Sequence, residues 1–405
     1  MEFVRRRFPG LDNGWAFFDN AGGTQILANV VERMNDFLFN SNVQTGGSYE
    51  VSQRAAAALN SGREAMATFV NAARAEEIVF APSTTVALQN LARAMASQFA
   101  SGDEVIVTVA DHESNIGPWV GLEKLGVKVR TWVPSCDSAA LDPAALQPML
   151  TKRTKLVAVT HVSNILGTIN PIADIAAVVH AHGARLCVDS VAFAPHRAID
   201  VRKLDVDYLA LSLYKVFGPH YAMLYGRHEL LLELDNLYHY FYGKEKTPAK
   251  LEPGNASYEL AYSATGIVDY LEALGRRCGA EGSPRQCLEH AFDKIALHES
   301  EIAAPLIEYL DRRSDCRIVG IADADESLRV PTISFVVDGV DSGELAKRID
   351  PYRIAIRYGD FHARRLAEHL GLMANNGCVR VSMTHYNTLQ EVAALVAALD
   401  AELPG

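Results

Sequence analysis

The sequence LALSLYKVFGP at positions 209–219 decides how the rest of the chain is arranged. It continues an apolar run, 208–213, that has the length and composition of a buried strand. Lys215 follows this run directly, and Gly218-Pro219 breaks regular structure beyond it. A lysine at the edge of a core is costly to bury, so it either reaches solvent or a carboxylate, or it serves chemistry. The chemical alternative is an amine of lowered pKa that forms a Schiff base with an aldehyde.

Length and composition indicate a large globular protein. The chain has 405 residues, of which 49% are hydrophobic and 21% charged, enough for two domains with a sizeable core. Its 38 basic and 49 acidic residues give a formal charge of −11, which argues against nucleic acid or an anionic membrane as the main partner. We expect neither a membrane span nor a signal peptide, because no apolar run is long enough and the basic N-terminal stretch has none behind it.

The cysteine pattern favours a reducing environment. The cysteines form no CxxC pair and show no spacing typical of a metal site; they lie at positions 136, 187, 278, 287, 316 and 378. We therefore expect a cytoplasmic protein that holds no metal.

Apolar strand-like runs alternate with amphipathic stretches of helical length between about residues 75 and 225. The expected strands are 77–80, 104–109, 128–133, 155–161, 185–190, 207–213 and 222–226, and the expected helices include 84–99, 142–150 and 171–182. This alternation predicts an α/β fold, in which a mostly parallel sheet of seven strands carries helices on both faces.

The C-terminal third has a different pattern. A helical period runs from 284 to 311. After it we expect strands at 330–337, 353–357 and 378–383 and helices at 342–349, 362–370 and from 387. These elements predict a second, smaller α+β domain.

Four of the expected strands end in chemically reactive residues. They lead to His112, to His161 with Ser163 and Asn164, to Asp189, and to Lys215. In open parallel sheets, ligands bind beyond the carboxyl ends of the strands. These side chains are therefore expected to converge at one edge of the sheet.

A possible anion site precedes the expected helix 84–99. The three hydroxyls of Ser83, Thr84 and Thr85 and the free N–H groups of a helix N-terminus can hold a phosphate. On its own, an ordinary helix N-cap explains this segment more simply.

The whole set of residues matches the requirements of pyridoxal phosphate. This cofactor needs a lysine for its aldehyde, a carboxylate that keeps its ring nitrogen protonated, and an anion site for its phosphate. Lys215 and Asp189 supply the first two, the segment 83–85 supplies the third, and His112 adds a flat ring.

Several motifs make the chain similar to a known family. The motifs are FFDNAGGTQ (17–25), ADHESNIGPW (110–119), THVSNILGTINPI (160–172), VDSVAFAPH (188–196), SLYKVFGPH (212–220) and RVSMTHYNTLQEV (380–392). Together they resemble the class V aminotransferases of fold type I, in the cysteine desulfurase and selenocysteine lyase group. The resemblance covers almost the whole chain and implies pyridoxal phosphate as the cofactor.

The resemblance also implies roles for individual residues. For the cofactor it implies a covalent bond at Lys215, a ring-nitrogen partner in Asp189, a stacking ring in His112, and further contacts from Asn164, Thr84, Thr85, Ser212, Tyr214 and Asn255. For the substrate we expect Arg380 to hold the α-carboxylate, with further contacts from Asn164, Arg357, Gln44, Thr45, Ser48, Tyr358 and His362. Each residue also has a purely structural alternative, such as a turn cap for Asn164 or an ion pair for Arg380.

The chain departs from the desulfurase pattern at several positions. A glutamine is replaced by Ala192, a phosphate-binding histidine by Tyr214, and a threonine contributed by the partner subunit by Asn255. Most importantly, the loop that reads R-x-G-x-x-C in desulfurases reads RYGDFH at 357–362 here, so that His362 stands where the sulfur-accepting cysteine would be. Cys378, which is near in sequence, is expected to be a core residue.

Without a thiol on that loop we expect no persulfide. The remaining apparatus predicts a C–S lyase, in which Lys215 removes the Cα proton and sulfur leaves Cβ, yielding pyruvate, ammonia and a thiol or sulfide. His362 would protonate the leaving group or recognise an acidic one. Epimerisation, as in isopenicillin N epimerase-like proteins, and transamination are the enzymatic alternatives, and a scaffold without catalysis is the alternative from another class.

The resemblance finally implies an assembly and a division of the chain. Fold type I enzymes build each active site at a dimer interface, so we expect a homodimer with shared sites that acts on a small-molecule amino acid. We expect an N-terminal segment, 1–15, that packs with the small domain, a large cofactor-binding domain at 16–280, and a small domain at 281–405.

Overall fold

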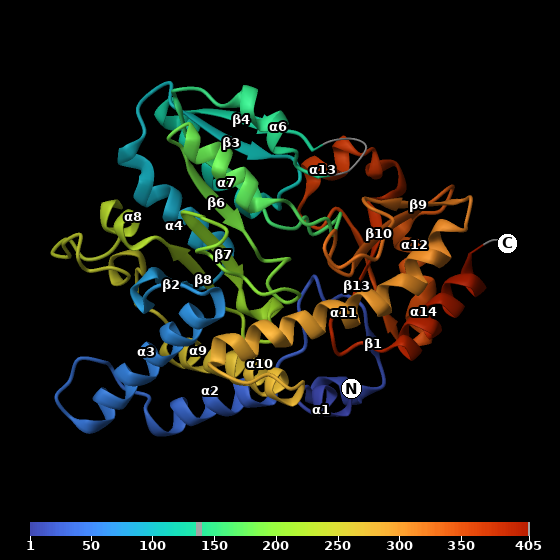
Figure 1. Cartoon of the computed structure of the whole chain (residues 1–405), viewed down its shortest axis with the longest axis horizontal. Coiled ribbons are helices and arrows are strands. Elements are labelled where there is room, and N and C mark those ends of the chain that lie inside the picture. The colour runs from blue at the N-terminus through green and yellow to red at the C-terminus, as the bar shows by residue number, and fades with distance from the viewer. Residues whose placement is uncertain (135–139, 404–405) are drawn as a thin grey trace.

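The computed structural model describes residues 1–134 and 140–403 of the chain, so Cys136 lies outside the described residues (Figure 1). Within these limits, seven strands form one sheet in the order β2 (Ile78–Ala81), β8 (Ala222–Gly226), β7 (Tyr208–Ser212), β6 (Arg185–Asp189), β5 (Thr154–Thr160), β3 (Glu104–Thr108) and β4 (Lys128–Trp132). Neighbours from β7 to β4 are parallel, whereas β8 is antiparallel to both β7 and β2. The expected mostly parallel sheet is confirmed.

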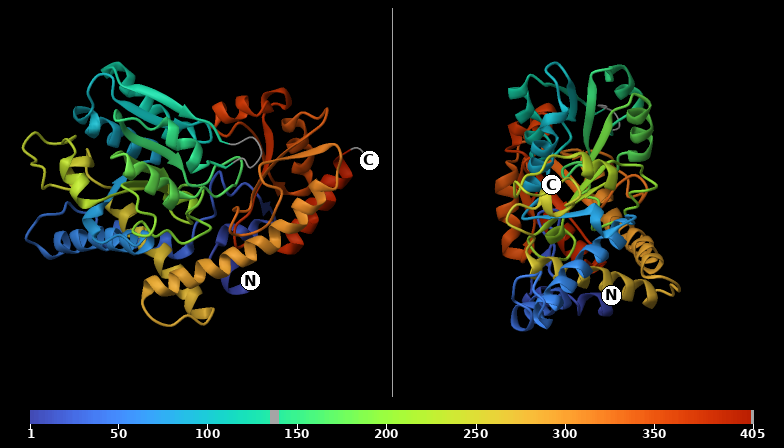
Figure 2. Two further views of the ribbon diagram at one scale, coloured as in Figure 1. Left: turned by 45° about the horizontal axis from the view of Figure 1, so that its top comes forward. Right: turned by 90° about the vertical axis from the view of Figure 1, so that its left-hand side faces the viewer.

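Except at the edge strand β4, both faces of this sheet are buried, which is why its other strands are largely continuous apolar runs. In β5, Val157 and Val159 enter the core on one face, and Leu156 and Ala158 enter the core on the other. Helices α3 (Glu50–Val70), α7 (Ile172–Ala181) and α10 (Thr265–Arg277) pack on the first face, and α4 (Thr84–Met95) and α5 (Gly117–Val120) pack on the second (Figure 2).

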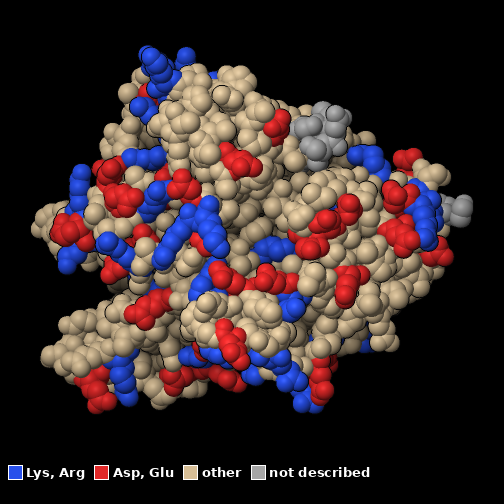
Figure 3. Space-filling model, viewed as in Figure 1, with Lys and Arg blue, Asp and Glu red and all other residues tan. Residues whose placement is uncertain are grey.

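Shorter helices and α2 complete the larger part of the molecule. They are α1 (Glu2–Arg5), α2 (Ala28–Asn40), α6 (Pro143–Leu146), α8 (His228–Glu233) and α9 (Tyr258–Ser263). None of the described helices is long and apolar enough to cross a membrane. Acidic and basic side chains are interspersed on the face shown in Figure 3.

The C-terminal part is the expected smaller α+β unit. Its antiparallel sheet has the order β12 (Arg357–Gly359), β13 (Cys378–Ser382), β10 (Thr332–Val337) and β9 (Cys316–Val319). Its helices are α11 (Pro284–Asp311), α12 (Ser342–Ile349), α13 (Arg364–His369) and α14 (Leu389–Glu402). Capping boxes start the two longest of them: Ser283 precedes α11 and pairs with Gln286 in its first turn, and Thr388 precedes α14 and pairs with Glu391 in its first turn.

Two details of this smaller sheet differ from the sequence-based expectation. The single strand expected at 353–357 is two strands: β11 (Ile354–Ala355) pairs with β1 (Ala16–Phe17), and β12 pairs with β13. The strand β9 was not expected, because it is short and only partly buried and so lacks a clear alternation.

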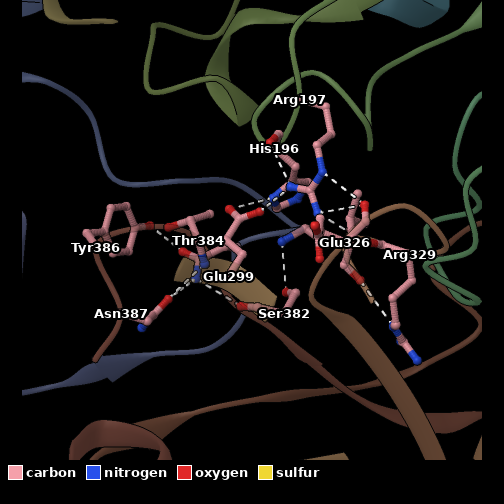
Figure 4. A network of polar contacts seen from close by, with 12 residues as sticks. His196, Arg197, Glu299, Glu326, Arg329, Ser382, Thr384, Tyr386 and Asn387 are labelled. Carbon is pink, nitrogen blue, oxygen red and sulfur yellow. Dashed lines mark hydrogen bonds and ion pairs between the residues drawn. The ribbon is translucent and has the colours of Figure 1, made fainter. Parts of the chain in front are cut away.

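Buried charges link the larger and smaller parts where α11 passes along both (Figures 2 and 4). Glu299 of α11 is fully buried; His196 Nδ1 lies 2.9 Å from one carboxylate oxygen and Arg197 lies 2.8 Å from the other. Arg197 also donates to the backbone oxygens of Glu326 and Arg329. This pairing and the backbone contacts compensate the cost of burying the Glu299 carboxylate.

Helices α10 and α11 approach each other closely at Gly275. A Cβ atom added there would lie only 1.9 Å from the backbone oxygen of Cys287 in α11. Glycine at position 275 therefore allows the close distance between these helices. Because α11 continues along the smaller part, this distance also affects how the two parts contact each other.

We expect Gly275→Ala to lower the free energy of unfolding by about 1–3 kcal/mol, because the helices must separate to admit the methyl group. Gly121→Ala is the matched control, since Gly121 has φ −57 and nothing within 4 Å of its added Cβ. Chemical denaturation of both variants measures the difference, and equal stabilities would contradict this account of the helix contact.

Candidate active site

A pocket lies at the carboxyl ends of the central strands. Its empty space is about 560 Å³, part of which is open to solvent. Its lining comes from segments after β2, β3, β5, β6 and β7: Ser83, Thr84, Thr85, His112, Ser114, Thr160, Val162, Asn164, Asp189, Val191, Ala192, Ser212, Tyr214 and Lys215. His161 lies outside this lining, buried against Phe193 with ring centroids 3.6 Å apart.

Lys215 lies at the end of a short 3-10 helix, Leu213–Lys215, that follows β7. The backbone N–H groups of Val216 and Gly218 both bond to the oxygen of Leu213 and fix this turn. Burial and the nearby Arg380 lower the pKa of the Lys215 amine to about 8, although Asp189 acts in the opposite direction. A lowered pKa leaves more of the amine in the neutral, nucleophilic form.

Two acidic residues, Asp189 and Asp111, lie close enough to influence each other's charge. Asp189 lines the pocket and accepts a hydrogen bond of 2.9 Å from the Val191 backbone N–H, while burial raises its pKa. Asp111 is fully buried and accepts hydrogen bonds from Thr108 at 2.5 Å and Asn115 at 2.6 Å. Burial raises the pKa of Asp111 to about 8, and Asp189 adds to the rise. At pH 7 Asp111 is therefore mostly protonated, which favours the charge on Asp189.

His112 contributes a flat, neutral ring to the pocket. Its Nδ1 accepts a hydrogen bond of 3.1 Å from the Ser114 backbone N–H, so the proton of the neutral ring is on Nε2. Burial, the charge of Lys215 and the nearby His362 lower the pKa of His112 to about 4. The ring is therefore suited to stacking and cannot act as a proton donor at pH 7.

Hydroxyl groups gather at the N-terminus of α4. Ser83 caps the helix. Thr84 Oγ1 lies 2.6 Å from Ser212 Oγ, and Thr85 Oγ1 lies 2.6 Å from Ser114 Oγ. Tyr214, whose ring stacks on His220 with centroids 4.5 Å apart, belongs to the same wall. These hydroxyls and the free N–H groups of the helix end form a cradle for an anion.

Arg380 reaches Asn164 at the pocket from β13 of the smaller part. Its guanidinium contacts Asp19 at 3.0 Å, donates to the Asn164 backbone oxygen at 3.3 Å and lies 3.8 Å over the ring of Phe361. The Nε atom of Arg380 and the Oδ1 atom of Asn164 are buried and have no hydrogen-bond partner within the described chain. Buried polar atoms rarely stay unpaired, so these two are expected to bind a ligand.

The loop after β12 brings His362 next to His112. The two rings have centroids 5.4 Å apart, and His362 is exposed on its outer side. Arg357, the first residue of β12, lies 3.4 Å from Asp19, the carboxylate that also contacts Arg380. The smaller part thus adds an imidazole and two guanidinium groups to the site.

Several predicted residues do not line the pocket within one chain: Gln44, Thr45, Ser48, Asn255 and Tyr358. Gln44 is exposed, and its side-chain oxygen accepts a hydrogen bond of 3.2 Å from the Tyr258 hydroxyl. Asn255 is also exposed and has a left-handed φ of 69. Both therefore lie on the surface of the larger part, apart from Lys215.

Sequence reasoning did not single out Asp19, Asp111 or Ser114 as site residues. Asp111 stands directly before His112, so a second acid after the same strand was an available signal. Asp19 lies within the FFDNAGGTQ motif, but its contact is with Arg380, 361 positions away. Cys378 is fully buried among Ile165, Leu166 and Phe361, which confirms it as a core residue.

Comparisons with known proteins identify the family of the chain. The family model described as aminotransferase class-V matches residues 16–395. The chain belongs to this family. It is 41% identical to an aminotransferase-like protein from Gibberella zeae, with 99% of this chain and 98% of the relative covered. It is 34% identical to a cysteine desulfurase-like protein from Aspergillus flavus, with coverage of 99% and 90%.

By fold, this member of the class V aminotransferase family resembles solved structures of cysteine desulfurases. The desulfurase from Thermococcus onnurineus has a TM-score of 0.87 at 28% identity and covers 99% of this chain and 97% of its own. The desulfurase CsdA from Escherichia coli has a TM-score of 0.83 at 26% identity, with 98% and 97% covered. The fold is therefore fold type I, and the protein is a pyridoxal phosphate-dependent enzyme of the desulfurase-like branch.

The residues present fit the family's cofactor. The hydroxyl cradle at α4 suits the phosphate, and the charge on Asp189 suits the ring nitrogen. The unpartnered Asn164 Oδ1 is a free polar contact in the same pocket. No group of residues in the described chain is arranged to hold a metal ion.

Replacing Lys215 with methionine should stabilise the cofactor-free protein at pH 7 by about 1–3 kcal/mol, because it removes the cost of a buried cation. The amine has a folded pKa of about 8 against an ordinary 10.5, so this cost is complete below pH 8 and disappears as the pH rises to 10.5. Thermal unfolding of K215M at pH 7 and pH 10 measures it. The exposed Lys152→Met is the control, and an equal shift in both variants would contradict the prediction.

Proposed function

We propose that this enzyme is a C–S lyase, which eliminates sulfur from Cβ of a cysteine-derived amino acid without forming a persulfide. The observation that carries the proposal is the loop residue His362, which stands beside His112 where desulfurases of this pattern carry a thiol. Among the cysteines in the described part of the chain, Cys378 lies beside this loop, with its Sγ 3.7 Å from the Gly359 backbone oxygen, but it cannot replace that thiol, because it is buried and burial raises its pKa to about 11.

When bound, pyridoxal phosphate supplies an electron sink for the charge left at the substrate's Cα. Lys215, as a neutral amine, takes the Cα proton and holds it on Nζ. Arg380 orients the substrate through its α-carboxylate, and Asp19 fixes the guanidinium with an ion pair of 3.0 Å. The low pKa of His112 leaves the exposed His362 as the imidazole that protonates the leaving sulfur.

The atoms of this reaction balance without an oxidant. The Cα–H and Cβ–S bonds break, the sulfur leaves as a thiol or sulfide, and hydrolysis of the resulting enamine gives pyruvate and ammonia. Lys215 lines the pocket and His362 lies beside His112 outside the lining. This pair favours elimination, because elimination needs an acid for the leaving sulfur as well as a base for the Cα proton.

Pyruvate release from L-cysteine, cystine and cysteine S-conjugates, measured with a coupled lactate dehydrogenase assay, tests the reaction. We expect Lys215→Ala to lower kcat by at least about 100-fold and His362→Asn by about 10–100-fold, because each removes a proton-transfer group. Cys378→Ala should retain activity. Solvent deuterium at Cα without cleavage would instead indicate epimerisation, and a pyridoxamine spectrum with the amino donor alone would indicate transamination.

We further propose a homodimer in which Asn255 and Gln44 complete the partner's site. For Asn255 this assignment follows from the family pattern, and both residues are exposed and absent from the pocket lining of their own chain. The loop that carries Asn255 is firmly held, because Glu252 forms a buried bidentate pair with Arg63 and accepts the Phe80 backbone N–H. We also propose a cytoplasmic location, in keeping with the cysteine pattern.

Subunit complementation tests the shared site. Lys215→Ala removes the amine, and Asn255→Asp places a negative charge against the partner's phosphate while keeping a residue that accepts a left-handed backbone. Each variant alone should be inactive. Unfolding and refolding the two together should recover about a quarter of the wild-type activity, because half of the dimers then contain one intact site. If the refolded mixture of the two variants forms dimers but recovers no activity, the proposal of a shared site is wrong.

A further inference from the structure

The loop after β12 is attached to the larger part by contacts on both sides of His362. The backbone oxygen of His362 accepts a hydrogen bond of 2.8 Å from the Glu113 backbone N–H. The backbone oxygen of the preceding residue, Phe361, accepts one of 2.8 Å from Asn164 Nδ2. Arg365 of α13, three residues after His362, forms a bidentate ion pair with Glu113, in which Nε and one terminal nitrogen each lie 3.1 Å from a carboxylate oxygen.

The backbone of this loop is strained at the point where these contacts meet. Phe361 and His362 are two consecutive non-glycine residues with left-handed φ values of 51 and 60. Such conformations cost free energy and persist only where the surrounding contacts determine them. The contacts are present: the ring of Phe361 lies against the guanidinium of Arg380, and both backbone oxygens are bonded to the larger part.

Glu113 is well placed to connect this loop with the site. It directly follows His112, the ring that faces His362, and its neighbour Ser114 contacts Thr85 of the hydroxyl cradle at 2.6 Å. One short segment, 112–114, therefore bonds to the loop through Glu113, faces His362 with the His112 ring, and contacts the hydroxyl cradle through Ser114. A side chain that fixes the loop to this segment also fixes the position of the His362 imidazole.

We propose that Glu113 and Arg365 are positioning residues, whose ion pair clamps the loop 359–365 and holds His362 over His112. This inference rests on the proposed role of His362 in the reaction, but the clamp itself is a property of the fold. Because both partners are about half exposed, the ion pair contributes modestly and is weakened by salt.

The chain offers a matched pair of variants. Glu113→Gln removes the ion pair with Arg365, which joins the two parts. Glu368→Gln removes an equally exposed ion pair with Arg364, which lies within α13. Both changes replace one glutamate with its neutral isostere and break one contact to an arginine of the same helix, so only the first loosens the clamp.

Amide hydrogen exchange of the holoenzyme, read by mass spectrometry, tests the clamp without any assay of activity. We expect Glu113→Gln to speed exchange up to about fivefold in peptides covering 112–116 and 359–366, with no change in peptides from β5 and β6. Glu368→Gln should leave the segment 112–116 at the wild-type rate. Arg365→Ala should repeat the Glu113→Gln result, and the reversed pair Glu113→Arg with Arg365→Glu should restore slow exchange.

The outcomes separate the clamp from the reaction. Equal exchange in Glu113→Gln and Glu368→Gln would overturn the clamp, whatever the enzyme catalyses. If exchange rises as expected but the wild-type enzyme releases no pyruvate, the clamp stands and the lyase is overturned. If both stand, Glu113→Gln should lower kcat by about two- to fivefold with little change in KM, because the loop holds the acid and not the α-carboxylate.

Discussion

The register between β6 and β7 is the constraint on which the site depends. Asp189 at the end of β6 pairs with Ala210, and β7 continues to Ser212 before the turn that carries Lys215. If β6 shifted by one residue, each of its side chains would point to the opposite face of the sheet, and Asp189 would lie in the apolar layer beside the sheet. The buried apolar residues on both faces prevent such a shift. The packing that stabilises the fold therefore also keeps the Asp189 carboxylate in the pocket that Lys215 lines.

Much of the larger part was predictable because its strands are buried on both faces. A strand without a solvent face must be apolar throughout, and its end is marked by the first reactive side chain, as at His112, Asp189 and Lys215. The smaller sheet gave weaker signals. The strand β9 has charged Arg317 and a half-exposed face, and β11 is two residues long and depends on β1, which is more than 300 positions away.

The remaining parts of the site could not be predicted from the sequence, for a physical reason. The partner of Arg380 is Asp19, at the opposite end of the chain, and no local pattern reports such a contact. Asp111 could not be recognised from the sequence, because the protonation of a buried carboxyl group depends on its environment: burial and the nearby Asp189 raise its pKa, against the hydrogen bonds from Thr108 and Asn115, which lower it. Gln44 and Asn255 were named through the family pattern, and one chain alone gives them no contact with Lys215.

The exchange of cysteine for His362 changes what the loop has to do. A thiol that accepts sulfur must approach the substrate, and then leave the pocket to pass the sulfur on, so its loop must move. An imidazole that donates a proton works best at one fixed distance, and its loop gains from being held. Here the loop bonds to Glu113 and Asn164 through its backbone, at the cost of two left-handed residues. That strain is consistent with a group that acts in place.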